Sequence, residues 1–112
     1  MKLKFYEKRS CTTCRKAKVF LSEKGAELES IDLNQGLSVE ELEKLIGKRD
    51  YRKFLNSRNV LYREMKMKDG PPPRDKAIKL MSENPNLIKR PVVKKGNTIV
   101  LGFDIEAFGE ML

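Results

Sequence analysis

Apolar residues recur along the chain with two different periods, and these predict a series of strands and helices. Residues 3–7 alternate apolar and polar side chains and include two aromatic residues, a pattern that is typical of a strand. Residues 12–24 instead place apolar side chains on one face at helical spacing, and Gly25 is a natural stop because glycine adopts the left-handed conformation readily. Residues 27–33 predict a second, weaker strand. The chain therefore begins β-α-β.

The middle of the chain is helical in pattern but irregular. Ser38 and Glu41 form a capping box at the start of a helix that ends at Gly47. Residues 51–67 have no long period, and we interpret them as short helical turns. The three prolines at 71–73 must break regular structure, because proline lacks an amide donor and fixes φ.

The last third of the chain predicts one more helix, a hairpin and a terminal helix. A helix is expected from residue 74 until Asn84-Pro85 ends it. Residues 91–93 and 98–101 flank a Lys-Gly-Asn turn, which is the signature of a β-hairpin. Asp104 then caps a helix that reaches the end of the chain.

This order of elements defines the expected fold. A right-handed crossover makes the first two strands parallel, and the hairpin adds two antiparallel neighbours. We therefore predict the α/β class and a thioredoxin-like fold: a four-stranded mixed sheet flanked by helices, with a helical insertion between strands 2 and 3. The 112 residues are the size of one domain, so residues 1–112 are expected to form a single unit with the insertion at about 36–88.

Composition and charge limit which catalytic groups the protein can use and which partners it can bind. The chain has no His, which excludes Ser-His and Cys-His nucleophile pairs and imidazole metal ligands. The net charge is +8, gathered in residues 1–16 (six bases, one acid) and 48–66 (seven bases, two acids). These segments suit an anionic partner, or they are a solvated lysine-rich surface. No apolar run approaches the ~20 residues of a membrane span and no secretory signal is evident, so we expect a cytoplasmic protein without membrane contact.

Two cysteines, Cys11 and Cys14, form a lone Cys-x-x-Cys at the junction of a strand and a helix, a pattern typical of redox chemistry. At the predicted start of the helix, unpaired amides and the helix dipole favour a thiolate on Cys11. Nearby positive charge is offered by Lys8, Arg9, Arg15 and Lys16. Cys14 lies one turn further on the apolar face, so we expect Cys11 to attack a partner sulfur and Cys14 to resolve the mixed disulfide.

Two other interpretations of the cysteine pair, a zinc site and a structural role, compete with redox chemistry. A zinc site needs about four ligands, and the chain offers two thiolates without a second pair, so no metal is expected. The cysteines could also be structural, because free cysteine is often a small buried hydrophobe.

A second informative stretch is Arg90-Pro91. A proline at the start of a strand can adopt the cis bond, and in thioredoxin-type folds such a proline lies across from the Cys-x-x-Cys. Arg90 would then place its guanidinium beside Cys11, to stabilise the thiolate or bind an anion. The plainer interpretation makes Pro91 a strand-start residue and Arg90 a surface base. Arg58, in the second basic segment, is a further candidate ligand near the same site, or it belongs to a solvated helix end.

Several motifs together resemble the ArsC/Spx family across nearly the whole chain. They are Cys11-Thr-Thr-Cys14-Arg15-Lys16-Ala17, Asn56-Ser57-Arg58, Tyr62-Arg63-Glu64, Asn84-Pro85-x-Leu87-Ile88-x-Arg90-Pro91-Val92-Val93 and Leu101-Gly102-Phe103. The resemblance implies a thioredoxin-like, glutaredoxin-like fold with the helical insertion. The glutaredoxin-linked arsenate reductases of the family carry a cysteine at the position of Cys11 and an arginine at that of Arg90. Two further family arginines fall at Ser57 and Phe103 here, so a trianion would be poorly compensated.

The Spx branch, whose members regulate transcription by binding the RNA polymerase α subunit, shares the Cys-x-x-Cys but extends further at its C-terminus. We therefore expect a thiol–disulfide oxidoreductase with Cys11 as nucleophile, Cys14 resolving and Arg90 orienting. Substrate contacts are expected from Arg90, Pro91 and Arg58. No bound cofactor is expected; glutathione or thioredoxin is the external reductant, and the partner is a thiol or disulfide protein or glutathione. An Spx-like regulator of RNA polymerase and a genuine arsenate reductase are the alternatives, and direct nucleic-acid binding ranks behind both.

Overall fold

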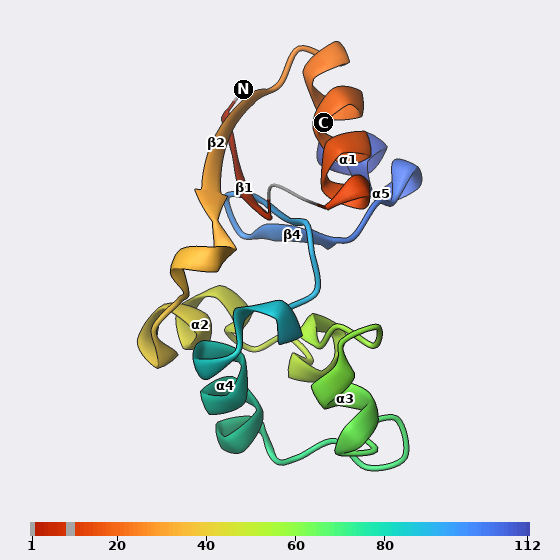
Figure 1. The fold of residues 1–112 in the computed structure, drawn as a ribbon. Helices are drawn as coiled ribbons and strands as arrows, with labels where there is room; N and C mark the ends of the chain where they lie inside the picture. Colours follow the sequence, from red (N-terminus) through yellow and green to blue (C-terminus); the bar gives the residue numbers. More distant parts are fainter. Residues whose placement is uncertain (1, 9–10) are drawn as a thin grey trace. The chain divides into compact units, whose positions relative to one another are not determined.

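The structure, a computed structural model, describes residues 2–8 and 11–112 (Figure 1). The chain divides into two compact units, one formed by Met1–Asp32 with Arg90–Leu112 and the other by Leu33–Lys89. The first unit contains the β-sheet, and the second is built from helices and turns. Among the described residues, no helix is long and apolar enough to cross a membrane.

The sheet of the first unit has four strands in the order β2-β1-β3-β4. Its strands are β1 (Lys2–Glu7), β2 (Glu27–Asp32), β3 (Val92–Lys95) and β4 (Thr98–Leu101). Strand β1 pairs in parallel with β2 and antiparallel with β3, and β3 pairs antiparallel with β4. This arrangement confirms the predicted mixed sheet. The second strand ends one residue earlier than predicted, because Leu33 already belongs to a 3₁₀ turn in which its side chain is buried.

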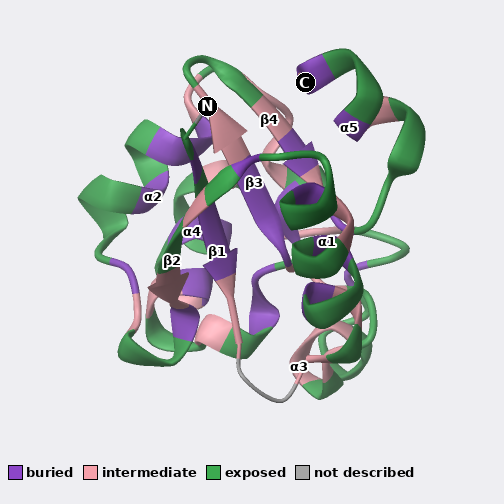
Figure 2. Cartoon of the chain, turned by 90° about the horizontal axis from the view of Figure 1, so that it is seen from above, coloured by how far each residue is buried: buried purple, intermediate pink, exposed green. Residues whose placement is uncertain are grey.

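Two helices of the first unit, α1 (Thr12–Glu23) and α5 (Ile105–Met111), contribute to a single core with the sheet (Figure 2). The buried residues of this core come from β1, α1, the turn before β2, β3, β4 and α5: Leu3, Phe5, Cys14, Ala17, Leu21, Ala26, Val93, Val100, Phe108 and Met111. Helix α1 ends where the sequence pattern predicts, since Gly25 has a φ of 85°. Apolar residues at helical spacing thus fix α1 along the strands.

The second unit is helical. Its helices are α2 (Val39–Ile46), α3 (Val60–Glu64) and α4 (Arg74–Glu83), with 3₁₀ turns at Leu33–Gln35, Tyr51–Phe54 and Pro85–Leu87. The predicted capping box is present: the Ser38 hydroxyl accepts from the Glu41 amide at 3.0 Å, and the Glu41 carboxylate accepts from the Ser38 amide at 3.1 Å. The irregular segment at 51–67 consists of one 3₁₀ turn and one short helix, as its broken periodicity indicated.

The capping box makes a prediction about stability. Ser38→Ala removes the acceptor of the Glu41 amide and should lower the free energy of unfolding by about 1 kcal/mol, the usual cost of losing an N-cap. Urea unfolding followed by far-UV circular dichroism measures the change. The control is Ser22→Ala, which alters an exposed serine inside α1 and should leave stability unchanged or slightly raised, because alanine favours helix. Equal destabilisation in the two variants would contradict the assignment.

Candidate redox site

Cys11 occupies the N-cap of α1. Its backbone is extended (φ −90°, ψ 113°), and its carbonyl accepts the first helical hydrogen bond, from the Arg15 amide, at 3.1 Å. The Cys11 sulfur accepts a hydrogen bond from the Cys14 amide at 3.2 Å. The first turn of α1 contains no acidic residue. The Cys11 sulfur therefore takes the place usually held by a serine or aspartate oxygen, at the positive end of the helix.

Cys14 lies one turn further along α1 and is 1 % exposed, within the core of the first unit. Both cysteines are free thiols. Burial, together with a hydrogen bond to Cys11, raises the pKa of Cys14 to about 12, although the backbone amide of Lys8 hydrogen-bonds the Cys14 sulfur and opposes this rise. Cys14 is therefore protonated at neutral pH.

The Cys11 thiol is in a different environment, since its side chain is only partly buried. Burial acts to raise the pKa of Cys11, but hydrogen bonds from Cys14 and Arg90, with the positive charge of Arg90, outweigh it and lower the pKa below its ordinary value. The two thiols of the pair are thus shifted in opposite directions. Such a separation distinguishes a sulfur that ionises and attacks from one that stays protonated until it is needed.

Arg90 and Pro91 complete the site from the other end of the first unit. The Arg90-Pro91 peptide bond is cis, and Pro91 is buried at the start of β3. The Pro91 carbonyl accepts a hydrogen bond from the Gly102 amide at 2.9 Å, which ties this turn to the end of β4. Since Arg90 hydrogen-bonds Cys11, residues 79 positions apart in sequence meet at one sulfur.

The structure brings four of the predicted site residues, Cys11, Cys14, Arg90 and Pro91, into the same unit. Of the bases expected around Cys11, Arg15 and Lys16 are exposed on α1, Lys8 contributes through its backbone amide, and Arg9 lies outside the described residues. Sequence reasoning missed the Lys8 amide, because every residue type except proline carries that group.

Arg58 belongs to the helical unit, in the turn before α3. Its amide donates to the Asn56 side chain at 3.1 Å, and its own side chain is exposed. Its part in substrate binding stays a prediction.

Phe103, at a position where the resemblance placed an arginine in the reductases, belongs to an aromatic cluster. Its ring meets the Phe20 ring edge-on with centroids 6.1 Å apart, and the Phe108 ring at 6.0 Å. Phe20 and Phe108 stack at 5.9 Å. The side chain at this position therefore covers the packing between α1 and α5 and supplies no positive charge to an oxyanion.

No group of three or more His, Cys, Asp or Glu side chains that could hold a metal ion occurs among residues 2–8 and 11–112. The cysteine pair of the described chain accordingly has no further ligand of these types beside it.

The chain is similar in sequence to known proteins and in fold to solved structures. The chain is 37% identical to Bacillus subtilis YusI over 115 residues, covering 98% of both proteins. It is 26% identical to the global transcriptional regulator Spx of Enterococcus faecalis over 105 residues, covering 91% of this chain and 80% of that protein. The solved structure of an arsenate reductase from Vibrio cholerae superposes with a TM-score of 0.85 at 28% identity, covering 100% of this chain and 98% of that one.

The mixed sheet, its flanking helices and the cysteine pair at the start of α1 define an α/β protein of the thioredoxin-like class. The family profile of ArsC matches residues 6–111. The chain belongs to the ArsC family.

The opposite shifts of the two thiols predict how each is alkylated. The alkylation rate of a thiol rises as pH passes through its pKa. The rate at which Cys11 reacts with iodoacetamide should therefore reach its half-maximum at a pH below the ~8.5 of a free thiol. Cys14 should stay unmodified below about pH 10, because its pKa is raised to about 12 and its side chain is buried. Peptide mass spectrometry after timed alkylation across pH measures both. Faster modification of Cys14 than of Cys11 would reverse the assignment.

Arg90→Gln should move the Cys11 midpoint to higher pH, because the variant removes the charge that lowers the Cys11 pKa. Arg15→Gln is the matched control, since it removes the same charge from an exposed position on α1. An equal shift in both variants would show that net charge, and not the contact with Arg90, sets the pKa.

Proposed function

We propose that the chain is a thiol–disulfide oxidoreductase in which Cys11 is the nucleophile and Cys14 the resolving thiol. The observation that carries this proposal is the Cys11 sulfur at the N-cap of α1, hydrogen-bonded by the Cys14 amide, with the protonated Cys14 thiol one turn away. A two-step thiol–disulfide exchange requires one sulfur that ionises readily and a second thiol nearby that stays protonated until the mixed disulfide has formed. The proposal covers the whole chain as one working domain, including the helical insertion at about 36–88.

In the first step the Cys11 thiolate attacks one sulfur of a partner disulfide. A bond forms between Cys11 and that sulfur, the partner's S–S bond breaks, and the leaving thiolate takes a proton from solvent. In the second step Cys14 loses its proton and attacks the Cys11 sulfur. The mixed disulfide breaks, the second partner sulfur leaves as a thiol, and the protein keeps a Cys11–Cys14 disulfide. Two electrons and two protons have passed to the partner, and glutathione or thioredoxin returns the protein to the dithiol.

Arg90 and Pro91 supply the contacts beside the reacting sulfur. The Arg90 guanidinium stabilises the Cys11 thiolate before attack and orients a partner's carboxylate afterwards, since a guanidinium is a bidentate donor. We expect a partner chain to lie along the Arg90-Pro91 turn, which the hydrogen bond from the Gly102 amide to the Pro91 carbonyl holds at the start of β3. A dithiol that starts its cycle reduced suits a reducing compartment, so we assign the protein to the cytoplasm.

The mechanism predicts a trapped intermediate. In Cys14→Ser the first step proceeds but the second cannot, so mixed disulfides through Cys11 should accumulate with an oxidised model peptide. Non-reducing electrophoresis and mass spectrometry detect them. The matched control, Cys11→Ser, leaves Cys14 buried and protonated and should form none. Adducts at Cys14 in the control, or their absence in Cys14→Ser, would contradict the assigned roles.

A second candidate is a redox-dependent regulator that binds the RNA polymerase α subunit. The observation in its favour is the similarity to proteins named as Spx regulators, which extends over 91% of this chain. The segment 48–66 offers exposed bases for such a contact. Arg52 is less suited to probe it, because it is paired with Asp50 at 2.9 Å. Lys48 and Lys53 are exposed and make better sites for charge reversal.

Calorimetry of the reduced and oxidised protein with the isolated α-subunit domain separates the two candidates. An oxidoreductase should show rapid exchange with glutathione and no redox-dependent binding. Tight binding that changes with the state of the cysteines and weakens in Lys48→Glu with Lys53→Glu, together with negligible exchange, would select the regulator.

Arsenate reduction is the third candidate, because solved neighbours of this fold are named arsenate reductases. Ser57 and Phe103 stand where the resemblance places two of the reductases' arginines, so a trianion would be held by one arginine instead of three. Steady-state turnover with arsenate, glutathione and glutaredoxin should therefore lie near background. Robust turnover would select this candidate instead.

A further inference from the structure

The resolving step of the proposed exchange needs a group that removes the proton from Cys14. This thiol is 1 % exposed and its pKa is raised to about 12, so it does not ionise readily by itself at neutral pH. Histidine is the side chain that most often accepts such a proton, and the chain has none. Aspartate and glutamate are then the side chains best suited to the task.

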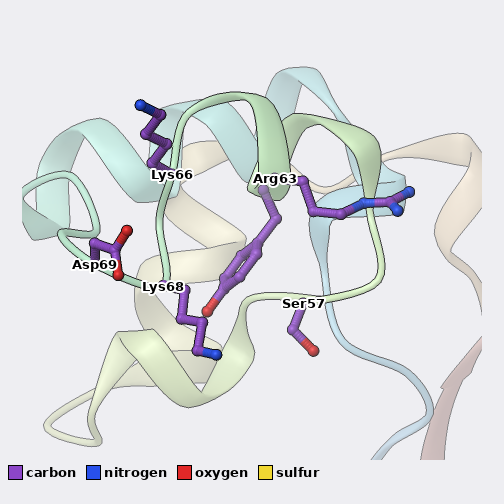
Figure 3. A pocket seen from close by; sticks show the side chains of 6 residues that line it. Ser57, Arg63, Lys66, Lys68 and Asp69 are labelled. Carbon is purple, nitrogen blue, oxygen red and sulfur yellow. The ribbon is translucent and has the colours of Figure 1, made fainter.

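Two carboxylate side chains of the first unit, Glu7 and Asp32, are partly shielded from solvent, whereas the others in its described residues are exposed. Glu7 and Asp32 end the neighbouring strands β1 and β2 and are register partners. In the helical unit, Asp69 lines a pocket of about 490 Å³ with Lys66 and four other residues, none of which is a cysteine (Figure 3). The candidates for the base are thus Glu7 and Asp32.

Two contacts connect Glu7 to Cys14. The Glu7 carboxylate pairs with the Lys18 ammonium at 3.3 Å, and Lys18 follows Cys14 by four residues on α1, so these two side chains are neighbours on the helix. The backbone amide of Lys8, the residue directly after Glu7, hydrogen-bonds the Cys14 sulfur. Glu7 is therefore linked to the thiol both through the partner of its side chain and through its backbone.

Strand geometry favours Glu7 over Asp32 as the base. Alternate side chains of a strand share a face, so Glu7 lies on the same face of β1 as Leu3 and Phe5, which belong with Cys14 to the core of the first unit. The Glu7 side chain is 15 % exposed, so its charge is largely withdrawn from solvent. Asp32 lies on the edge strand β2, whereas Glu7 lies on β1, the strand that precedes α1 in the chain.

We propose that Glu7 is the general base of the resolving step, held in position by Lys18. The proposal rests on the function proposed above. The Glu7 carboxylate takes the Cys14 proton, directly or across one water, as the Cys14 sulfur attacks the Cys11 sulfur. The Cys11–Cys14 bond forms, the mixed disulfide breaks, and its electron pair leaves on the partner sulfur, which takes a proton from solvent. Glu7 then returns its own proton to solvent.

An effect of charge alone would have the opposite sign. A negative charge beside a thiol raises the pKa of the thiol, so replacing Glu7 by neutral glutamine would ease the ionisation of Cys14 and speed the resolving step. Loss of a general base slows the step, because only solvent is left to take the proton. The charged groups on elements packed around this position are Lys18 on α1, Asp32 on β2 and Arg90, whose charge reaches the same thiol. The substitution leaves all three in place.

The test follows the mixed disulfide of Cys11 with glutathione after the full-length reduced protein is mixed with oxidised glutathione, by acid quench and mass spectrometry. In Glu7→Gln the adduct should form at close to the wild-type rate. It should decay about 100-fold more slowly at neutral pH, the lower end of what a positioned general base contributes. The decay should quicken as pH rises, because hydroxide replaces the missing base.

Three further variants make the result specific. Lys18→Gln breaks the same ion pair but keeps the carboxylate, so it should lose the same thermal stability as Glu7→Gln and slow the decay much less. Glu23→Gln removes an exposed carboxylate from α1 and should decay like the wild type, as should Asp32→Asn. Unchanged or faster decay in Glu7→Gln, or equal slowing in Asp32→Asn or Glu23→Gln, would overturn the proposal. If no glutathione adduct formed even in Cys14→Ser, the proposed function would fall, and the role of Glu7 with it.

Discussion

The packing of α1 against β1 is the interaction on which the redox site depends. Ala17 and Leu21 of the helix are fully buried with Leu3 and Phe5 of the strand, and each large apolar side chain buried there contributes about 1.5–3 kcal/mol. Because this contact fixes the helix along the sheet, the first turn of α1 begins close to where β1 ends. The Cys11 amide donates a hydrogen bond to the Lys8 carbonyl at 3.1 Å. The sulfur is therefore placed by the hydrophobic core of this unit, against which Cys11 itself packs.

The parts of the fold that could be predicted from sequence are those set by local chemistry. Gly25 ends a helix through its own backbone freedom, and Ser38 with Glu41 forms a capping box within four residues. The cysteine pair was placed at a helix start by apolar spacing alone. The nearness of Arg90 to Cys11 depends instead on β1 pairing with β3, a contact between distant segments that no local pattern specifies. It was expected only once the whole order of elements had been assembled.

Other features lay beyond any local signal. Lysine is a rare choice for a left-handed C-terminal cap, so the turn at Lys66 could not be anticipated, nor could the pocket that the turn lines. The edge-on contact of Phe103 with Phe20 joins the end of β4 to the last part of α1. The Phe103 contact is decided by side chains that meet only after folding, and the order of residues along the chain does not reveal it.

In the proposed mechanism the Cys11 sulfur is both the reacting atom and the cap of α1, so the chemistry is linked to the backbone of the helix. Its hydrogen bond from the Cys14 amide is strongest when the sulfur carries a negative charge. A mixed disulfide or a sulfenic acid removes that charge while the amide remains, so the first turn of the helix frays more readily after each chemical step. Exchange of the Cys14 amide proton with water should therefore follow the oxidation state of its neighbour. In the proposed mechanism, the exchange rate of this one backbone proton reports whether Cys11 is a thiolate or a disulfide.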